Sequence, residues 1–281
     1  MSPKQLVPDL DTLPLFPDIP TPEQVEQELT FRSLKSPVWS HQKARLIEKY
    51  LYFFVMITKH GTYIDGFSGP QAPDALETWS AKRVIESRPR YLRNFFLCEL
   101  DVAKVDMLKS LWDSQPPKEK KEAKRTCRFY QGDFNEKVDE ILASGEISEK
   151  QATFALLDQR TFECRWSTVV KLARHKQGNK IELFYFLAVK WLHRSLSGLV
   201  ANPQTAQEWW GRDDWQVLRN KSQNDICALV CERFKSELGY KHAFPFPIWE
   251  AEAGGGSIMY YMIHATDHDQ APGLMWRAYN Q

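Results

Sequence analysis

Residues 62–70 read TYIDGFSGP. A short apolar run ends at Asp65, and the chain then passes through Gly66 and Gly69. This order predicts a β-strand that ends in an acid and turns into a helix, as at the first strand of a nucleotide-binding α/β sheet. Because glycine has no side chain, the backbone of such a turn can approach a ligand closely. The spacing is not the Gly-x-Gly-x-x-Gly of dinucleotide-binding proteins, and glycines that serve turn geometry alone are the alternative.

A second apolar run, FFLCE at residues 95–99, also ends in an acid, Glu99. Apolar residues at positions 102, 105, 108 and 111 predict a helix directly after it. In a nucleoside-binding sheet of this kind, an acid at the end of the second strand accepts both ribose hydroxyls. The alternative is a surface carboxylate that caps the helix.

Three further runs continue the pattern. Residues 127–133, CRFYQGD, predict a third strand and a turn, in which Asp133 either contacts an adenine amine or forms an Asx-turn or helix cap. The fourth strand is predicted over residues 152–157 and is followed by DQRTFE at 158–163. Residues 180–187 are almost continuously apolar, which is typical of a strand buried on both faces. Strands that alternate with helices predict βαβ units.

Four stretches together resemble a known family. They are WSHQK at residues 39–43, YIDGFSG at 63–69, LLDQRTFE at 156–163 and YYMIHATDH at 260–268. Over residues 36–281 the chain resembles the three-Cys-motif partner (TcmP) proteins, bacterial proteins named after a neighbouring protein with three cysteines that is similar to radical S-adenosylmethionine (SAM) enzymes. The resemblance implies a Rossmann-like class I methyltransferase sheet of about seven strands, with helices on both faces and an antiparallel last strand, expected at 257–266 after the Pro-rich stretch 244–248 and the glycines at 254–256.

The same resemblance implies SAM as the cofactor. The residues expected to bind it are Lys43, Asp65, Gly66, Phe67, Ser68, Gly69, Glu99, Leu100, Asp133 and Phe134. Asp158 is expected to face both the cofactor and the methyl acceptor, with Gln159, Arg160 and Glu163 lining the mouth of the site. Many enzymes that methylate base amines have Asp-Pro-Pro-Tyr here, and the Asp-Gln-Arg-Thr of this chain weakens that specific assignment.

The chain is expected to comprise a Pro-rich arm at residues 1–35, which either wraps the body or is a disordered tail, and a methyltransferase-like domain at 36–281. A helix is expected from about residue 40, capped by Ser40, with Lys43 near the cofactor or solvated in the first turn. A helical cap insertion is expected at 197–222. Its three tryptophans, Trp209, Trp210 and Trp215, are interpreted as packing rather than as a base-stacking surface.

Composition bounds the remaining possibilities. The 37 basic and 36 acidic residues give a net charge of +1, which offers no support for nucleic-acid binding, and the basic run 118–128 is interpreted as a solvated helix face. No segment resembles a signal peptide or is long enough to span a membrane. Five scattered cysteines predict a reducing cytoplasm. No His or Cys spacing predicts a metal site.

The function predicted from the sequence is SAM-dependent methyl transfer to an unknown acceptor, with nucleic acid as one candidate. A non-catalytic adaptor that serves the three-cysteine protein is the alternative. A magnesium-dependent nucleic-acid enzyme is a third interpretation. All three rest on one expectation: Asp65, Glu99 and Asp133 share a crevice at the carboxyl ends of parallel strands.

Overall fold

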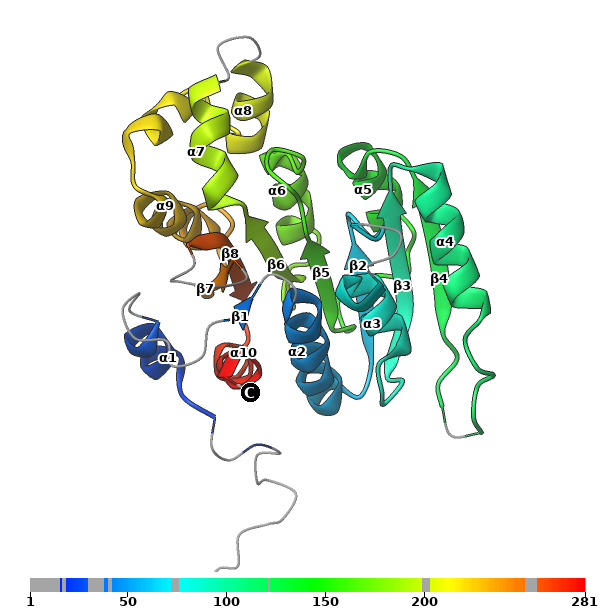
Figure 1. Ribbon diagram of the computed structural model, residues 1–281. Coiled ribbons are helices and arrows are strands. Elements are labelled where there is room, and N and C mark those ends of the chain that lie inside the picture. Colours follow the sequence, from blue (N-terminus) through cyan, green and yellow to red (C-terminus); the bar gives the residue numbers. More distant parts are fainter. Residues whose placement is uncertain are drawn as a thin grey trace, which may run out of the picture.

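The protein is described here from a computed structural model, which describes residues 16, 19–29, 38–39, 42–71, 76–120, 122–198, 203–250 and 257–280. The described strands form one eight-stranded sheet in the order β1-β7-β8-β6-β5-β2-β3-β4 (Figure 1). The strands are β1 (Val38–Trp39), β2 (Gly61–Asp65), β3 (Leu92–Glu99), β4 (Thr126–Gln131), β5 (Thr153–Leu157), β6 (Glu182–Leu187), β7 (His242–Trp249) and β8 (Ile258–Thr266).

Helices alternate with these strands along the chain. They are α1 (Pro22–Glu28), α2 (Lys43–Thr58), α3 (Ser80–Glu86), α4 (Val102–Asp113), α5 (Phe134–Leu142), α6 (Trp166–Arg174), α7 (Val189–Gly198), α8 (Pro203–Trp210), α9 (Gln223–Ser236) and α10 (Ala271–Asn280), with short 3-10 turns η3 (Leu76–Thr78) and η4 (Trp215–Asn220). No helix in the described part of the chain is both long and apolar enough to cross a membrane.

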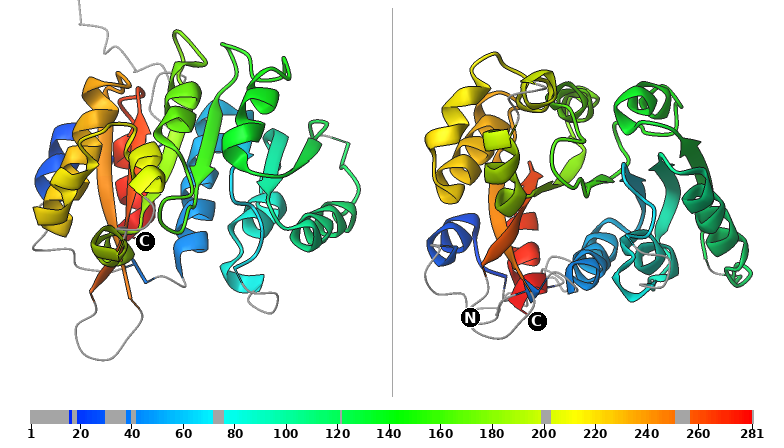
Figure 2. Two further views of the ribbon diagram at one scale, coloured as in Figure 1. Left: turned by 90° about the horizontal axis from the view of Figure 1, so that it is seen from above. Right: turned by 45° about the horizontal axis from the view of Figure 1, so that its top comes forward.

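Strands β2 to β6 pair in parallel, and β8 runs antiparallel between β6 and β7. Helices cover both faces of the sheet, as the view along the sheet from above shows (Figure 2). The predicted Rossmann-like class I methyltransferase fold, with an antiparallel last strand, is therefore confirmed. The sheet has one more strand than expected, because the two residues of β1 pair with the end of β7.

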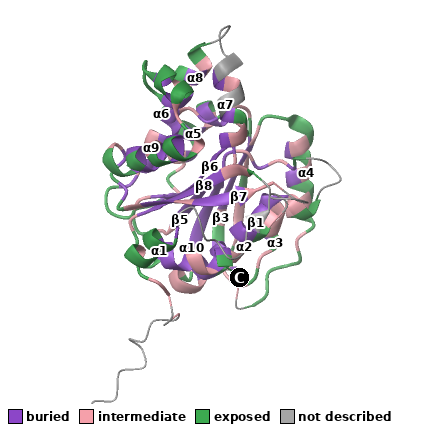
Figure 3. Cartoon of the chain, turned by 60° about the vertical axis from the view of Figure 1, so that its left-hand side comes forward, coloured by how far each residue is buried: buried purple, intermediate pink, exposed green. Residues whose placement is uncertain are grey.

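The two faces of the sheet bury separate apolar cores. In β5, Ala155 and Leu157 pack with side chains of α5, α6, α7 and α9, whereas Phe154 and Leu156 pack with those of α2, α3 and α10. Alternate residues of a strand point to opposite faces, so a strand covered on both sides is apolar throughout. Figure 3 shows the consequence, a buried sheet between partly exposed helices. The carboxyl ends of the parallel strands then remain the open edge on which a site can be built.

Strand β7 was not expected, because residues 244–248 contain two prolines. Proline has no N–H to donate and is confined to strand edges. Pro245 and Pro247 lie two residues apart, so their backbone nitrogens face the same edge of β7. Strand β8 lies along the other edge, and among the described residues β1 pairs only with Ile248 and Trp249. The carbonyl of Pro247 accepts a hydrogen bond from the hydroxyl of Tyr279 in α10 (2.6 Å). The prolines therefore occupy positions where their missing donors cost little.

The N-terminal arm contains a helix that was also not expected. Thr21 and Gln24 form a reciprocal capping box, Pro22 occupies the first helical position, and Val25 and Leu29 are buried. This Thr-Pro-x-Gln signal is present in the sequence and predicts a helix start. Helix α1 packs against α10. Ser40, the expected cap of the next helix, lies outside the described residues, and the N-cap position of α2 is Gln42.

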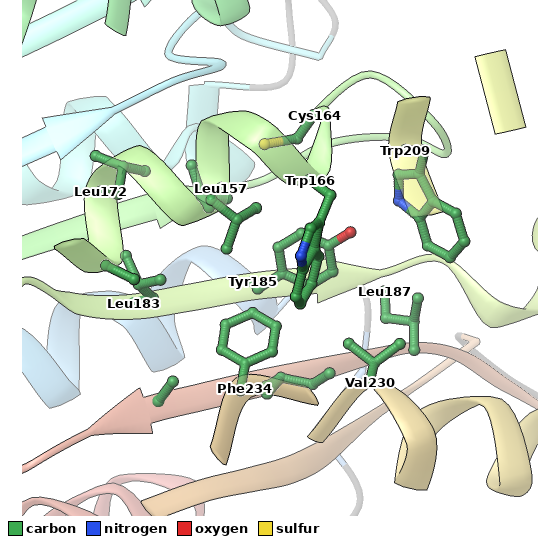
Figure 4. Close-up of a cluster of buried hydrophobic side chains, with 14 of the residues drawn as sticks. Leu157, Cys164, Trp166, Leu172, Leu183, Tyr185, Leu187, Trp209, Val230 and Phe234 are labelled. Atoms are coloured by element: carbon green, nitrogen blue, oxygen red, sulfur yellow. The ribbon is translucent and has the colours of Figure 1, made fainter. Parts of the chain in front are cut away.

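The tryptophans of the expected cap insertion are buried. Trp209, Trp210 and Trp215 are each less than a tenth exposed, and Trp209 lies in the core together with Tyr185 and Phe234 (Figure 4). The guanidinium of Arg233 stacks between the rings of Trp166 and Trp210, at 3.8 and 4.1 Å from their centroids. Packing, rather than base stacking, therefore explains these indoles.

Candidate functional site

The glycine turn after β2 is fastened to the end of β3. The backbone N–H and the hydroxyl of Ser68 both donate to the carbonyl of Cys98, each at 2.9 Å. The indole N–H of Trp79 donates to the carbonyl of Ser68 at 2.6 Å. Ser68 is buried, and its side chain therefore holds the turn in place.

Glu99 closes the other side of this turn. Its Oε2 accepts the backbone N–H of Gly69 at 2.8 Å, and its Oε1 accepts that of Asp101 at 3.0 Å. A Cβ at Gly69 would lie only 2.8 Å from the carboxyl carbon of Glu99, so a larger residue at this position would displace the carboxylate. Glycine is therefore needed at residue 69 for close approach. Two of the carboxylate's lone-pair positions are used by the protein, and the remaining ones are available for further donors.

The three acids predicted to share a crevice do lie around one point. Burial, together with the charges of Glu99, Asp65 and Asp133, raises the pKa of the Cys98 thiol to about 12. Hydrogen bonds join the three strand ends: the N–H of Gly132, directly before Asp133, donates to the carbonyl of Glu99 at 3.0 Å, and the N–H of Gly69, in the turn after Asp65, donates to the Glu99 carboxylate at 2.8 Å. The convergence follows from the topology, because β2, β3 and β4 are adjacent parallel strands whose carboxyl ends meet at one edge.

Asp133 and Phe134 have roles inside the protein. Asp133 is the N-cap of α5, where its Oδ1 accepts the N–H of Asn135 at 2.8 Å, as the capping alternative predicted; its contact with an adenine remains a prediction. The ring of Phe134 packs directly over Gly66, where an added Cβ would lie 2.7 Å from it. Gly66 was expected to leave room for a cofactor. The buried ring of Phe134 instead fills the space on the side where a Cβ of residue 66 would point.

Asp65 is the most perturbed acid of the site. It is 1% exposed, and its carboxylate accepts the hydroxyl of Tyr63 (2.7 Å) and the N–H of Phe67 (3.1 Å). The pKa of Asp65 is raised to about 7, chiefly by burial and also by the charges of Asp158 and Glu99, which together outweigh the lowering effect of the two hydrogen bonds. A carboxyl group that changes charge near neutral pH is typical of functional sites. Tyr63 was missed, although it lies two residues before Asp65 and thus on the same face of β2.

Lys43 and Asp158 form a largely buried ion pair. The ammonium of Lys43 lies 2.6 Å from Asp158 Oδ1, and the two side chains are 6% and 12% exposed. Lys43 begins α2 and Asp158 follows β5, so the pair joins two elements 115 residues apart in sequence. The alternative of a solvated first-turn lysine is therefore wrong. Asp158 lies at the carboxyl end of its strand, as expected, but it carries its own counter-ion.

In the loop after Asp158, one residue, Gln159, is buried although it was expected to be exposed at the mouth of the site. Gln159 was predicted to line the mouth of the site, but it is 1% exposed, and its side-chain oxygen accepts the N–H of Cys164 at 3.0 Å. It holds the loop from inside. Arg160 and Glu163 are exposed, and the N–H of Arg160 donates to Glu163 Oε2 at 2.8 Å. Their role at a mouth stays a prediction.

A small hollow connects these groups. Asp65, Ser68, Gly69, Trp79 and Asp158 line it together with neighbouring residues, and its volume is about 10 Å³. That is room for about one water molecule, far below the several hundred Å³ of a typical cofactor pocket. Next to Glu99, in contrast, Leu100 is 67% exposed. The site is therefore nearly closed at Asp65, whereas the residue next to Glu99 is exposed.

Among the described residues, no three His, Cys, Asp or Glu side chains are grouped so as to hold a metal ion. Cys227 and Cys231 are buried neighbours on α9, and burial raises the pKa of Cys227 well above its usual value. His264 is also buried, 3.0 Å from Glu182. These groups belong to the core.

Comparison with known proteins gives structural likeness only. No protein-family model matches the sequence, and no curated protein sequence is similar to it. Among solved structures, the chain is similar to Trm1 from Pyrococcus horikoshii in complex with S-adenosyl-L-methionine, with 13% identity and a TM-score of 0.45 over 85% of this chain and 59% of that one. It is also similar to a putative methyltransferase, BH2331, from Bacillus halodurans C-125, with 7% identity and a TM-score of 0.33 over 79% of this chain and 98% of that one. The chain thus spans less than two thirds of the length of Trm1.

Proposed function

We propose that the protein is a SAM-dependent methyltransferase. The observation that carries the proposal is the joint between Gly69 and Glu99, where a glycine turn and a strand-end carboxylate are held together by a backbone hydrogen bond of 2.8 Å. This holds a strand-end acid in a fixed place at the turn, with lone pairs left for the hydroxyls of a ribose. The exposed Leu100 gives the same place an apolar surface for an adenine ring.

The residues present fit the cofactor. Glu99 accepts the ribose hydroxyls with the lone pairs that Gly69 and Asp101 leave unused. Asp65, once ionised, accepts the ammonium of the methionine part. Because the hollow beside Asp65 holds only about 10 Å³, entry of that part displaces side chains of its wall, which includes Trp79.

SAM supplies an activated methyl group on a sulfonium, so the protein has mainly to align donor and acceptor. Lys43 keeps the Asp158 carboxylate in place at 2.6 Å, at the end of β5 and within reach of the Asp65 side. Asp158 then binds the acceptor through its remaining lone pairs. Nucleic acid is a candidate acceptor, and the resemblance to the bacterial three-Cys-motif partner proteins and their cytoplasmic location stay predictions.

Calorimetry tests the proposal. Titration with SAM and with its product S-adenosylhomocysteine should give saturable heat for the wild-type protein. Glu99→Gln should weaken binding about 10-fold or more, because a charged acceptor becomes a neutral one. Glu232→Gln, which changes an exposed acid on α9, is the matched control and should bind like wild type. Absence of heat with both ligands at millimolar concentration would end the proposal.

One observation favours a second candidate, the non-catalytic adaptor. The hollow at Asp65 is nearly filled by the protein's own side chains, as in a fold that has lost its ligand. An adaptor would bind the three-cysteine protein without binding SAM. A pull-down with that partner, made alongside the calorimetry, separates the two candidates.

A further inference from the structure

Three aromatic side chains gather beside Asp158. Phe186 is the second-last residue of β6, Trp191 lies in the first turn of α7, and Tyr260 is near the start of β8. Tyr260 contacts both others, with ring centroids 5.6 Å from Trp191 and 6.2 Å from Phe186. We call these three residues the aromatic cluster. They meet because β8 runs antiparallel to β6, so that the start of one lies beside the end of the other.

The aromatic cluster is joined to the candidate site through Lys43. Its ammonium lies 4.8 Å from the ring centroid of Phe186 and 5.3 Å from that of Tyr260, while it also pairs with Asp158. The pKa of Tyr260 is raised to about 12, chiefly by burial, with smaller effects of the nearby charges. Lys43 therefore links Tyr260 to Asp158.

Asp158 is shared by the hollow and by the ion pair that borders this cluster. It lines the hollow together with Asp65, and it contacts the ammonium that rests on the aromatic rings. A ligand on the cluster would therefore lie near Asp158, which also lines the hollow where the methyl donor is expected. This is the position that a methyl acceptor must occupy.

Exposure and charge limit the kind of acceptor. Trp191 is 36% exposed and Tyr260 is partly exposed, so their rings offer stacking area, whereas the cap tryptophans are buried. The Lys43 ammonium already occupies the faces of Phe186 and Tyr260, and a cationic acceptor would meet a like charge there. A neutral planar ring meets no such repulsion. The polar edge of such a ring would face the Lys43 ammonium, a hydrogen-bond donor, and the Asp158 carboxylate, a hydrogen-bond acceptor. A donor and an acceptor side by side are what hydrogen-bonds the edge of a nucleobase.

We propose, on the basis of the proposed methyltransferase function, that the acceptor is a nucleobase of a single-stranded nucleic acid, stacked on the exposed ring of Trp191 beside Tyr260, with its edge toward Asp158 and Lys43. In the transfer, a nucleophilic atom of the base forms a bond to the methyl carbon as the bond from that carbon to sulfur breaks. The electron pair of the broken bond stays on sulfur, which becomes the thioether of S-adenosylhomocysteine, and the proton displaced from the base passes to water.

Fluorescence anisotropy with short labelled oligonucleotides tests this inference. Single-stranded RNA and single-stranded DNA form separate arms, both with saturating S-adenosylhomocysteine, and unlabelled nucleosides serve as competitors. The wild-type protein should bind at least one arm, and Trp191→Ala should weaken that binding roughly 5- to 100-fold, the effect of losing a stacking partner. Trp191→Phe keeps an aromatic face and should retain most of the affinity, which separates stacking from misfolding.

The matched control is Tyr52→Ala, which removes an exposed aromatic ring from α2 more than two helical turns away from Lys43. It should bind oligonucleotides like wild type. Equal affinity of wild type and Trp191→Ala, equal loss in Tyr52→Ala, or nucleosides that compete as well as oligonucleotides would overturn the inference. If S-adenosylhomocysteine gives heat in calorimetry but neither oligonucleotide binds, the inference fails and the methyltransferase proposal stands. If S-adenosylhomocysteine also gives no heat, both fail.

Discussion

The substitution Gly69→Ala tests the candidate site with a single methyl group. The added Cβ would lie 2.8 Å from the carboxyl carbon of Glu99 and 2.7 Å from Cδ of Lys104. Non-bonded carbon atoms rest at about 3.5–4.0 Å, so the carboxylate must withdraw by about 1 Å. The hydrogen bond from the Gly69 N–H to Glu99 Oε2, now 2.8 Å long, is then lost, while the one from Asp101 can remain.

The expected magnitude follows from that one bond. A hydrogen bond to a charged group contributes about 1.5–3 kcal/mol. Replacing glycine by alanine returns about 0.4–1 kcal/mol by restricting the unfolded chain. The free energy of unfolding should therefore fall by about 1–2 kcal/mol. Because the displaced carboxylate no longer meets the ribose hydroxyls, the dissociation constant of S-adenosylhomocysteine should rise about 10- to 100-fold.

Urea unfolding and calorimetry measure the two effects separately. Gly178→Ala is the control, since a Cβ at Gly178 has no neighbour within 4 Å and its backbone is outside the left-handed region. It should leave both quantities near wild type. Wild-type stability together with wild-type affinity in Gly69→Ala would refute the account of the joint between Gly69 and Glu99.

Two further predictions concern buried charge. The Asp65 carboxyl, with its pKa raised to about 7, keeps its proton in the folded state while the unfolded chain loses it near pH 4, so wild-type stability should fall by about 4 kcal/mol between pH 4 and 7. Asp65→Asn removes this slope, and a stability difference between the two proteins that stays constant with pH would contradict it. Arg233→Lys removes the guanidinium that stacks between Trp166 and Trp210, and it should lower the free energy of unfolding in urea by about 2–4 kcal/mol. The exposed control Lys235→Ala should lower it by less than about 0.5 kcal/mol. Similar losses in both variants would show that the stacking is not the cause.

The order of the central strands was predictable because each is a short apolar run with an acid or a polar turn after it. The convergence of Asp65, Glu99 and Asp133 followed from that order, since adjacent parallel strands end at one edge. Strand β7 was not predicted, because its two prolines lack the N–H groups that a strand normally donates. At the edge of a strand those missing donors cost little, so the strand can form. Helix α1 was missed despite a complete capping signal at Thr21.

The side-chain contacts within the candidate site could not be predicted from the sequence. Lys43 and Asp158 are 115 residues apart, and no local pattern pairs them. Gln159 was placed at the mouth because it is polar, but it is buried: the N–H of Cys164 satisfies its side-chain oxygen, whereas its Nε2 has no hydrogen-bond partner among the described residues. Neither Phe134 over Gly66 nor Trp79 against Ser68 has a signal in the spacing of the sequence, because both contacts are set by how α5 and the segment before α3 pack.

The place of β8 in the sheet has a consequence for how the protein is made. On a ribosome the strands emerge in numerical order, yet β7 reaches the sheet only through β8, which also covers the outer side of β6. Until residues 258–266 have been synthesised, β6 carries an unpaired edge on a strand whose six side chains are all buried in the finished molecule. Such an edge is a template for wrong pairing with other chains. Nascent chains that stop before residue 258 should therefore depend on chaperones, and release of that dependence should coincide with the appearance of the last strand.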